Sequence, residues 1–215
     1  MINNSISSQD KNTLTKLYFY MQDASIEIES CVSLLYIAEK FINGESYREM
    51  IREDKYLVIS PSEGSLQAYV TMSRVAFHNI VINIFKLSEL FEKKQRILNL
   101  IPEFRDAANN FRKDFFTDEL KFYRNKYVAH HSDKEQQNDF LSLDQLKACF
   151  CKIIGIKEEQ FNSNINTVFP YLLKYAENFY SKSNKNSKQI CQIIHQSKYE
   201  IETKLGCQLN RNISF

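Results

Sequence analysis

The chain has 215 residues, a formal net charge of +2 and 43% hydrophobic residues, with only four Gly and three Pro. A charge so near zero gives no overall attraction to nucleic acid or membranes, so any nucleic-acid site has to be local. The apolar content excludes a disordered chain, and the scarcity of turn-forming residues favours a few long helices. A chain of this length is expected to form one domain, or one domain with a helical extension.

Apolar residues recur at helical spacings of three and four from near the N-terminus. They predict a helix over residues 10–41, followed by Gly44 in a left-handed conformation. In the polar stretch that follows, residues 56–59 form at most a single short strand, and nothing obvious pairs with it. Ser65 then opens the most apolar helix, residues 66–91, whose apolar side chains cover more than one face. Such a helix is buried by several neighbours, or by neighbours and a second subunit.

Three shorter helices are predicted next. The first, over residues 93–101, stops at Pro102, and the second runs over residues 103–113. Thr117 is a suitable N-cap for the third, residues 118–131, because its hydroxyl accepts a hydrogen bond from a free N–H of the first turn.

The C-terminal third predicts three more helices after a polar connector. Ser142 and Gln145 form a capping box, and Gly155 ends the helix that they begin. Two further apolar stripes predict separate helices over residues 165–179 and 190–205. The predicted fold is therefore an all-α bundle of about six to eight helices.

No apolar run approaches the roughly 18 residues needed to span a membrane, and the first residues lack the apolar stretch of a signal peptide. The five cysteines are odd in number and form no Cys-x-x-Cys pair, and the four histidines occupy three distant places in the sequence. These features argue against a disulfide framework and against a zinc site. We expect a cytoplasmic protein that binds no metal and no cofactor.

One short segment carries recognisable chemistry: Tyr-Arg-Asn-Lys-Tyr-Val-Ala-His-His at residues 123–131, followed by Ser132 and Asp133. It resembles the signature of the HEPN superfamily, in which an Arg and a polar residue precede a His by four to six intervening residues. Here Arg124 is followed by Asn125, and five residues stand between Arg124 and His130. The Lys, Ala and Asp around these residues resemble the abortive-infection branch. The apolar helix upstream is also similar to the helix that precedes the motif in such proteins, so the likeness covers about residues 66–133.

The resemblance implies a HEPN-like bundle over residues 1–141 with a C-terminal helical extension over 142–215 packed on it, or one single domain. It implies a metal-independent endoribonuclease that acts as a homodimer and leaves a 2′,3′-cyclic phosphate. It further suggests the toxin of a toxin–antitoxin system or an antiviral effector of abortive infection, with an antitoxin or regulatory protein as partner. The catalytic residues it assigns are Arg124, Asn125 and His130, and the residues in possible support are His131, Lys126 and Tyr127.

The residue types suit RNA cleavage, because RNA carries its own nucleophile in the 2′-hydroxyl. A His has a pKa of about 6.5 and moves protons near neutral pH. An Arg stays charged and pairs with two phosphate oxygens at once. Ideal α-helical geometry places His130 about 120° from Arg124 and His131 only about 20° away. Arg124 and His130 therefore converge only if the helix loosens before His130 or a second subunit completes the site. Helical periodicity favours His131 as the partner of Arg124, whereas the motif favours His130.

Plainer interpretations stand beside this one. Arg124 and His130 are also compatible with a solvated arginine and a histidine that favours the end of a helix dipole. His78 is expected to be a satisfied interior histidine, and the basic groups Lys93, Lys94, Arg96 and Arg112, Lys113 are expected to be solvated, although a local RNA track could use them. Ser132 stands where some HEPN proteins carry a modifiable Tyr, which argues against control through that Tyr.

The rival function is a catalytically silent HEPN-like module that binds nucleotide, RNA or a protein, and a third possible function is that of a helical scaffold.

Overall fold

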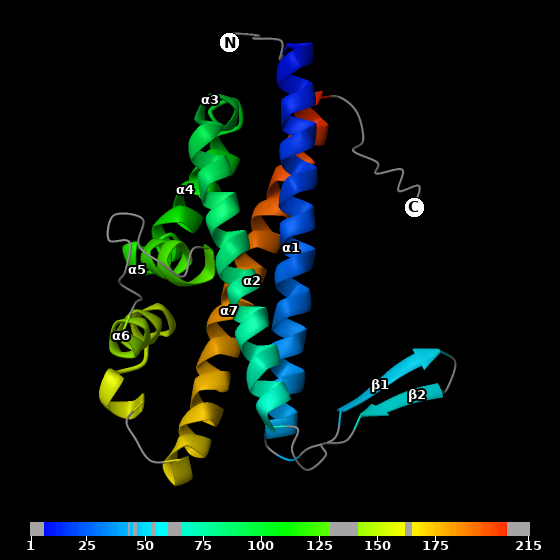
Figure 1. Cartoon of the computed structure of the whole chain (residues 1–215). Helices are drawn as coiled ribbons and strands as arrows, with labels where there is room; N and C mark the ends of the chain where they lie inside the picture. Colours follow the sequence, from blue (N-terminus) through cyan, green and yellow to red (C-terminus); the bar gives the residue numbers. More distant parts are fainter. Residues whose placement is uncertain are drawn as a thin grey trace.

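The computed structural model describes residues 7–42, 44, 47–52, 55–59, 66–129, 142–161 and 165–205. Within these residues the chain forms seven α-helices, a π-helical segment, a 3-10 turn and one β-hairpin (Figure 1). The prediction of an all-α helical bundle with further helices at its C-terminus is confirmed. None of the described helices is both long and apolar enough to cross a membrane.

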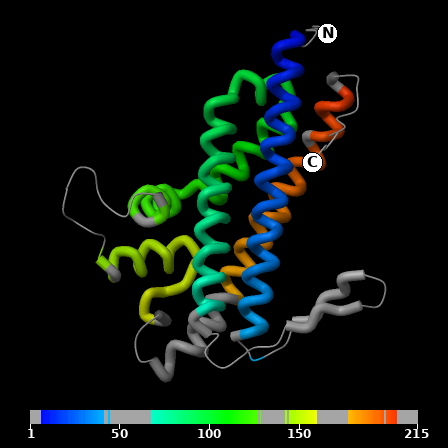
Figure 2. Tube along the Cα trace, turned by 45° about the vertical axis from the view of Figure 1, so that its right-hand side comes forward, coloured from blue at the N-terminus to red at the C-terminus, as the bar shows by residue number. Residues whose placement is uncertain are grey.

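Three long helices run side by side through the whole length of the molecule: α1 (Ser8–Ile42), α2 (Leu66–Lys93) and α7 (Ile165–Leu205) (Figures 1 and 2). The helix predicted over residues 10–41 is confirmed as α1. Its innermost side chains repeat every seven residues, which returns to the same face after two turns. They are Leu14, Met21, Ile28 and Leu35, each at most 2% exposed.

The single helix α7 replaces the two helices that were predicted for this stretch. The residues between the two apolar stripes are mostly polar, which suggested a break there. In the structure the buried face of α7 continues through that interval with small polar side chains, namely Ser183, Asn186 and Ser187, each at most 5% exposed. A helix can bury small hydroxyl and amide groups at low cost in volume, so a gap in hydrophobicity did not mean a gap in the helix.

A β-hairpin lies between α1 and α2 and projects away from the helices (Figure 1). Strands β1 (Tyr47–Arg52) and β2 (Lys55–Ile59) pair antiparallel, with Tyr47 opposite Ile59. The expectation that the second strand has no partner was therefore wrong. Gly44, just before the hairpin, has a φ of +74°, which confirms its predicted left-handed conformation.

The remaining helices are short: α3 (Gln95–Leu98), α4 (Pro102–Phe115), α5 (Asp118–Tyr123), α6 (Leu143–Ile154) and the 3-10 turn η2 (Glu158–Phe161). The helix predicted over residues 93–101 is reduced to one turn. Pro102 begins α4 rather than only ending its predecessor, a position where its missing N–H has no cost. The capping box of Ser142 and Gln145 is present, and Gly155 ends α6 with a φ of +75°.

The apolar surface of α2 is accounted for largely within the chain. Its buried side chains face α1 on one side and the short helices on the other, and they include Phe77, Ile80, Ile84 and Phe91. Val75 is the one large apolar side chain of α2 that is strongly exposed among those described. Of the two explanations for its hydrophobicity, burial by several neighbours is the one this structure displays.

Candidate functional site

The described part of the predicted motif, residues 123–129, lies where α5 ends against the middle of α2. Thr117 caps α5 as predicted, its hydroxyl accepting a hydrogen bond from the Leu120 N–H at 3.3 Å. Leu120 and Tyr123 are each 3% exposed and anchor the inner face of the helix in the core. Arg124 is the first residue after this anchored turn, so the packing of Tyr123 fixes where the arginine backbone lies.

From Arg124 to Ala129 the chain continues as the π-helical segment η1. The α-helix predicted to run to residue 131 is therefore wrong beyond Tyr123. A π-helix bonds each N–H to the carbonyl five residues back and is wider than an α-helix. The α-helical phase that placed His131 about 20° from Arg124 consequently does not apply, and the periodicity argument for His131 loses its basis. Such local widenings occur frequently at functional sites.

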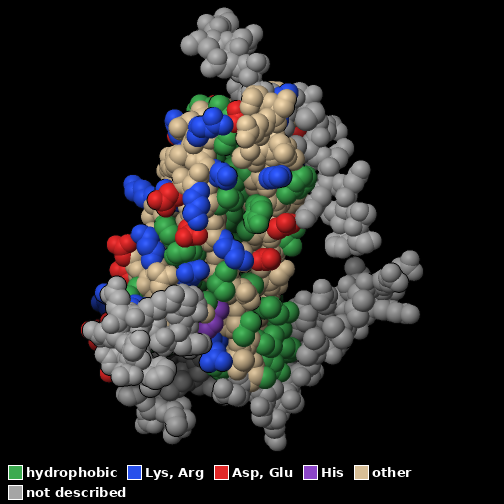
Figure 3. Space-filling view, turned by 45° about the horizontal axis from the view of Figure 1, so that its top comes forward, with side chains coloured by type: hydrophobic (Ala, Val, Ile, Leu, Met, Phe, Trp, Pro, Cys, Tyr) green, Lys and Arg blue, Asp and Glu red, His purple; other side chains and the backbone are tan. Residues whose placement is uncertain are grey.

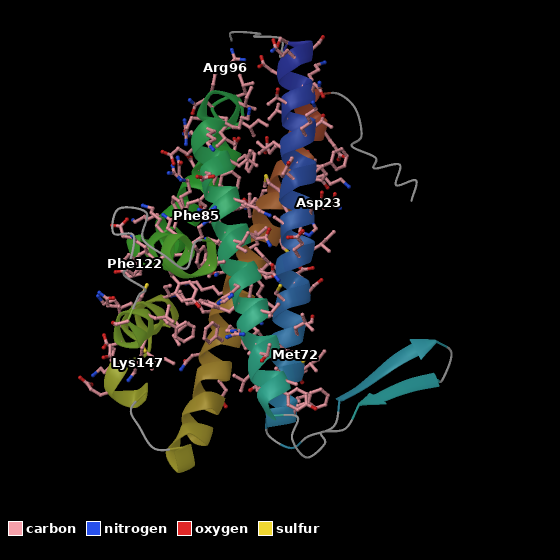
Figure 4. The ribbon with its side chains drawn as sticks, in the orientation of Figure 1. Asp23, Met72, Phe85, Arg96, Phe122 and Lys147 are labelled. Carbon is pink, nitrogen blue, oxygen red and sulfur yellow. The ribbon has the colours of Figure 1, made fainter. Side chains whose placement is uncertain are left out.

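Two consecutive residues of the motif helix contact α2 at positions seven residues apart. The Tyr123 hydroxyl lies 3.1 Å from Nε2 of His78, a hydrogen bond in which either group can donate. The guanidinium carbon of Arg124 lies 4.4 Å from the centre of the Phe85 ring. Seven residues span about 10 Å of an α-helix and return to the same face. Figure 4 shows Phe85 on α2 beside α5. The start of η1 is thus held at two points.

The guanidinium of Arg124 is arranged to receive an anion. Its position over the ring favours the cation electrostatically, and the contact removes water from that side. Nη1 donates to Oδ1 of Asn125 at 2.9 Å, which fixes the orientation of the fork. No carboxylate within the described part of the chain pairs with Arg124. Among the described residues, no acid occupies its remaining N–H groups, the donors that a phosphate would use.

The structure brings together Arg124 and Asn125, the first two predicted catalytic residues. Asn125 is exposed and Lys126 half-buried. Tyr127 lies in η1, but its side chain is outside the described residues. His130 and His131 also lie outside the described residues, as do Ser132 and the polar connector. The convergence of Arg124 with either histidine accordingly stays a prediction.

Phe85 was not predicted to belong to the site, and His78 was expected only to be a satisfied interior histidine. His78 is half-buried and hydrogen-bonded, in agreement with that expectation, but its partner is the residue before Arg124. The signal for Phe85 was its place one heptad after His78. A single sequence does not reveal that α5 would cross α2 there, because that depends on the packing of distant helices.

The basic groups noted in the sequence are largely paired with acids. Arg96 pairs with Asp10, Lys93 with Glu89 and Arg112 with Glu92. On the face shown in Figure 3, basic and acidic side chains are interspersed rather than gathered by sign. Lys93, Lys94, Arg96 and Lys113 are exposed, as predicted for solvated groups, whereas Arg112 is half-buried. Arg124 has no acidic partner among the described residues.

No group of three or more potential metal ligands lies together among the described residues. The four cysteines described are free thiols. Burial, and the negative charge of Glu119, raise the pKa of Cys149 to about 11. Because the thiolate is the form that attacks and binds metals, this shift makes Cys149 a poor nucleophile at neutral pH.

Comparison with known protein families identifies the family of this chain. No curated protein and no solved structure matches the chain significantly. The HEPN-like integron domain, however, matches residues 10–159, which include α1 to α6, the hairpin and the whole motif segment. The match covers well over half of the chain, and the chain therefore belongs to the HEPN-like integron domain family.

Proposed function

We propose that the protein is a metal-independent endoribonuclease with Arg124, Asn125 and His130 as its catalytic residues. The observation that carries this proposal is the Arg124 guanidinium, stacked on Phe85 and oriented by Asn125, with no acid beside it among the described residues. Membership in the HEPN-like family, which includes ribonucleases, supports it further.

The reaction requires two proton transfers, one from the 2′-hydroxyl and one to the 5′-oxygen, and a stabilised phosphate. The 2′-hydroxyl oxygen attacks the neighbouring phosphorus, and His130 takes the hydroxyl proton as general base. The bond from phosphorus to the 5′-oxygen breaks, and that oxygen takes up a proton as it leaves, from the protonated His130 or from water that His130 then protonates. Arg124 pairs with the non-bridging phosphate oxygens, where negative charge develops. The products are a 2′,3′-cyclic phosphate and a 5′-hydroxyl.

The widened helix sets a geometric condition that the proposal has to meet. In a regular α-helix Arg124 and His130 point about 120° apart. A π-helix turns less per residue than an α-helix, so the segment Arg124–Ala129 does not by itself bring His130 closer in phase to Arg124. We infer that His130 meets the phosphate held by Arg124 either because the chain changes direction after Ala129 or because the histidine comes from the second subunit of a homodimer. Lys126, Tyr127 and His131 are proposed only in support of phosphate binding.

A role as the toxin of a toxin–antitoxin pair, or as an antiviral effector of abortive infection, is part of this proposal. It rests on the resemblance of the motif to the abortive-infection branch. An antitoxin or another regulatory protein is the partner that such a role requires, and an active enzyme is expected to be toxic to the host that expresses it.

The test is cleavage of a labelled single-stranded RNA in excess EDTA, with a DNA strand of the same sequence as control. We expect RNA fragments that end in 2′,3′-cyclic phosphate and intact DNA, because DNA lacks the 2′-hydroxyl. Loss of cleavage in EDTA with recovery in Mg²⁺ would contradict the mechanism. RNA binding without any cleavage would favour the catalytically silent module instead.

The oligomeric state is tested separately. We expect light scattering at micromolar concentration to give the mass of a homodimer. A stable dimer interface buries on the order of 1,200–2,000 Å² in total. A monomeric mass in a protein that still cleaves RNA would show that one subunit carries a complete site.

A further inference from the structure

The helix α7 lines two shallow hollows on the side of α4 and α6. They share Asp114, Ser181 and Lys185, so together they form one continuous groove. The two hollows measure about 1060 Å³ and about 760 Å³, counting the space open to solvent. The family match ends before α7 begins. The groove is therefore lined partly by the matched domain and partly by the helix that follows it.

Three lysines follow one another at intervals of three residues along this groove: Lys182, Lys185 and Lys188. Residues three apart on a helix are neighbours, so their positive charges reinforce one another. No ion pair joins any of the three to a carboxylate within the described residues. Lys93, Arg96 and Arg112, in contrast, each pair directly with a carboxylate.

Lys182 is the most confined of the three. Its side chain is half-buried, and Nζ donates to the carbonyl oxygen of Ile153 at the end of α6. Burial and the nearby charge of Lys185 lower its pKa. An ammonium group held in this way keeps two further N–H donors, and a bound anion would relieve the repulsion between the two lysines.

Two acids limit the positive charge of the groove: Asp114 lines it, and the charge of Glu119 acts on Lys182 and partly offsets the lowering of its pKa. Asp114 is exposed, and its carboxylate accepts a hydrogen bond from the side-chain amide of Gln189 at 3.4 Å. The lining thus carries three positive charges and one negative charge. The rest of the rim supplies amides and hydroxyls, which donate hydrogen bonds to phosphate oxygens without regard to base sequence.

We propose that this groove binds the phosphodiester backbone of the RNA substrate at a distance from the motif. The inference rests on the proposed function, because it takes RNA as the ligand. The three lysines span about 9 Å along the axis of α7, enough for adjacent phosphates of a single strand. The helix that follows the matched domain then serves to hold RNA, which gives the C-terminal extension a function.

The test is fluorescence anisotropy with a short 2′-O-methyl oligoribonucleotide, whose blocked hydroxyl prevents cleavage. The variant K185Q/K188Q removes two exposed charges from the groove, and K93Q/K94Q removes two exposed charges elsewhere as the matched control. We expect K185Q/K188Q to bind about tenfold more weakly at 0.1 M salt. The slope of log affinity against log salt should fall by about 1.4, since each phosphate contact contributes about 0.7 for a single strand. The control should resemble the wild-type protein.

A third variant tests the sign of the effect. D114N removes the one acidic charge of the groove lining and should strengthen binding, by up to about fivefold. Circular dichroism checks that all three variants fold. Equal binding by K185Q/K188Q and K93Q/K94Q, in a protein that otherwise binds and cleaves RNA, would overturn the groove alone. Wild-type protein that neither binds nor cleaves RNA would overturn the proposed function itself.

Discussion

The helices α5 and α6 begin in the same way and end differently. Thr117 and Ser142 each cap the first turn with a side-chain hydroxyl. The helix α6 then stays regular for three turns and ends at Gly155, in the left-handed conformation that glycine adopts most easily. The helix α5 has only six α-helical residues before it widens into η1.

This difference separates what local sequence decides from what packing decides. Every feature that shapes α6 is a residue of α6 itself, whereas η1 carries no cap or glycine that explains its widening. Two contacts with α2 hold its first turn, one from Tyr123 to His78 and one from Arg124 to Phe85. A distorted helix persists only where its surroundings hold it. The shape of η1 therefore depends on the helix it packs against, and not only on its own residues.

The largest expected effects come from the motif itself. Arg124→Ala and His130→Ala should each lower single-turnover RNA cleavage by at least about 10²-fold, because one removes the phosphate cation and the other the proton-transfer group. His131→Ala is the matched control and should cost only severalfold.

Circular dichroism should show that all three variants fold, since Arg124 lies outside the core. If His131→Ala abolishes cleavage and His130→Ala does not, the assignment of the two histidines is reversed. Full activity in all three would show that the active site lies elsewhere.

The next effect concerns the ring beneath the guanidinium. Phe85→Leu keeps an apolar side chain on α2 but removes the cation–π contact, worth about 0.5–2 kcal/mol. Cleavage should fall by roughly two- to thirtyfold, because Arg124 loses the surface that orients it. Urea unfolding, with Phe116→Leu as a control at the ring packed against Phe85, separates lost orientation from lost stability. Equal activity in the two variants would show that the stacking does not matter.

The same contrast explains which features could be predicted from the sequence. Both caps and both left-handed glycines were predictable, because each depends on residues within one turn. The hairpin partner of β2 and the unbroken course of α7 were not, since the first depends on pairing and the second on burial of small polar residues. For the site, the motif pointed to Arg124 and Asn125. Phe85 and the π-helical segment arise only when α5 crosses α2.

A pair of cap variants should sharpen the comparison of α5 with α6. Ser142→Ala and Thr117→Ala should each lower the free energy of unfolding by about 1 kcal/mol, the usual cost of losing a cap. Only Thr117→Ala should also reduce cleavage, because it loosens the helix that positions Arg124. Urea denaturation and single-turnover kinetics on the same preparations test this. Equal losses of activity would mean that α6 contributes to the site as much as α5.

The smallest expected effect tests the other anchor of η1. Tyr123→Phe removes the hydroxyl that pairs with His78 but keeps the ring, which packs edge-on against Phe77 at 5.4 Å. A net hydrogen bond contributes about 0.5–1.5 kcal/mol, so the free energy of unfolding should fall by that amount. Cleavage should fall severalfold at most, because Phe85 still holds Arg124.

The double variant with Phe85→Leu is decisive, since residues that hold one element together show coupled effects. If the two contacts jointly hold η1, the double variant should lose more activity than the product of the single losses. Simple multiplication of the two effects would mean that each contact acts alone, and the widened helix would then need another cause.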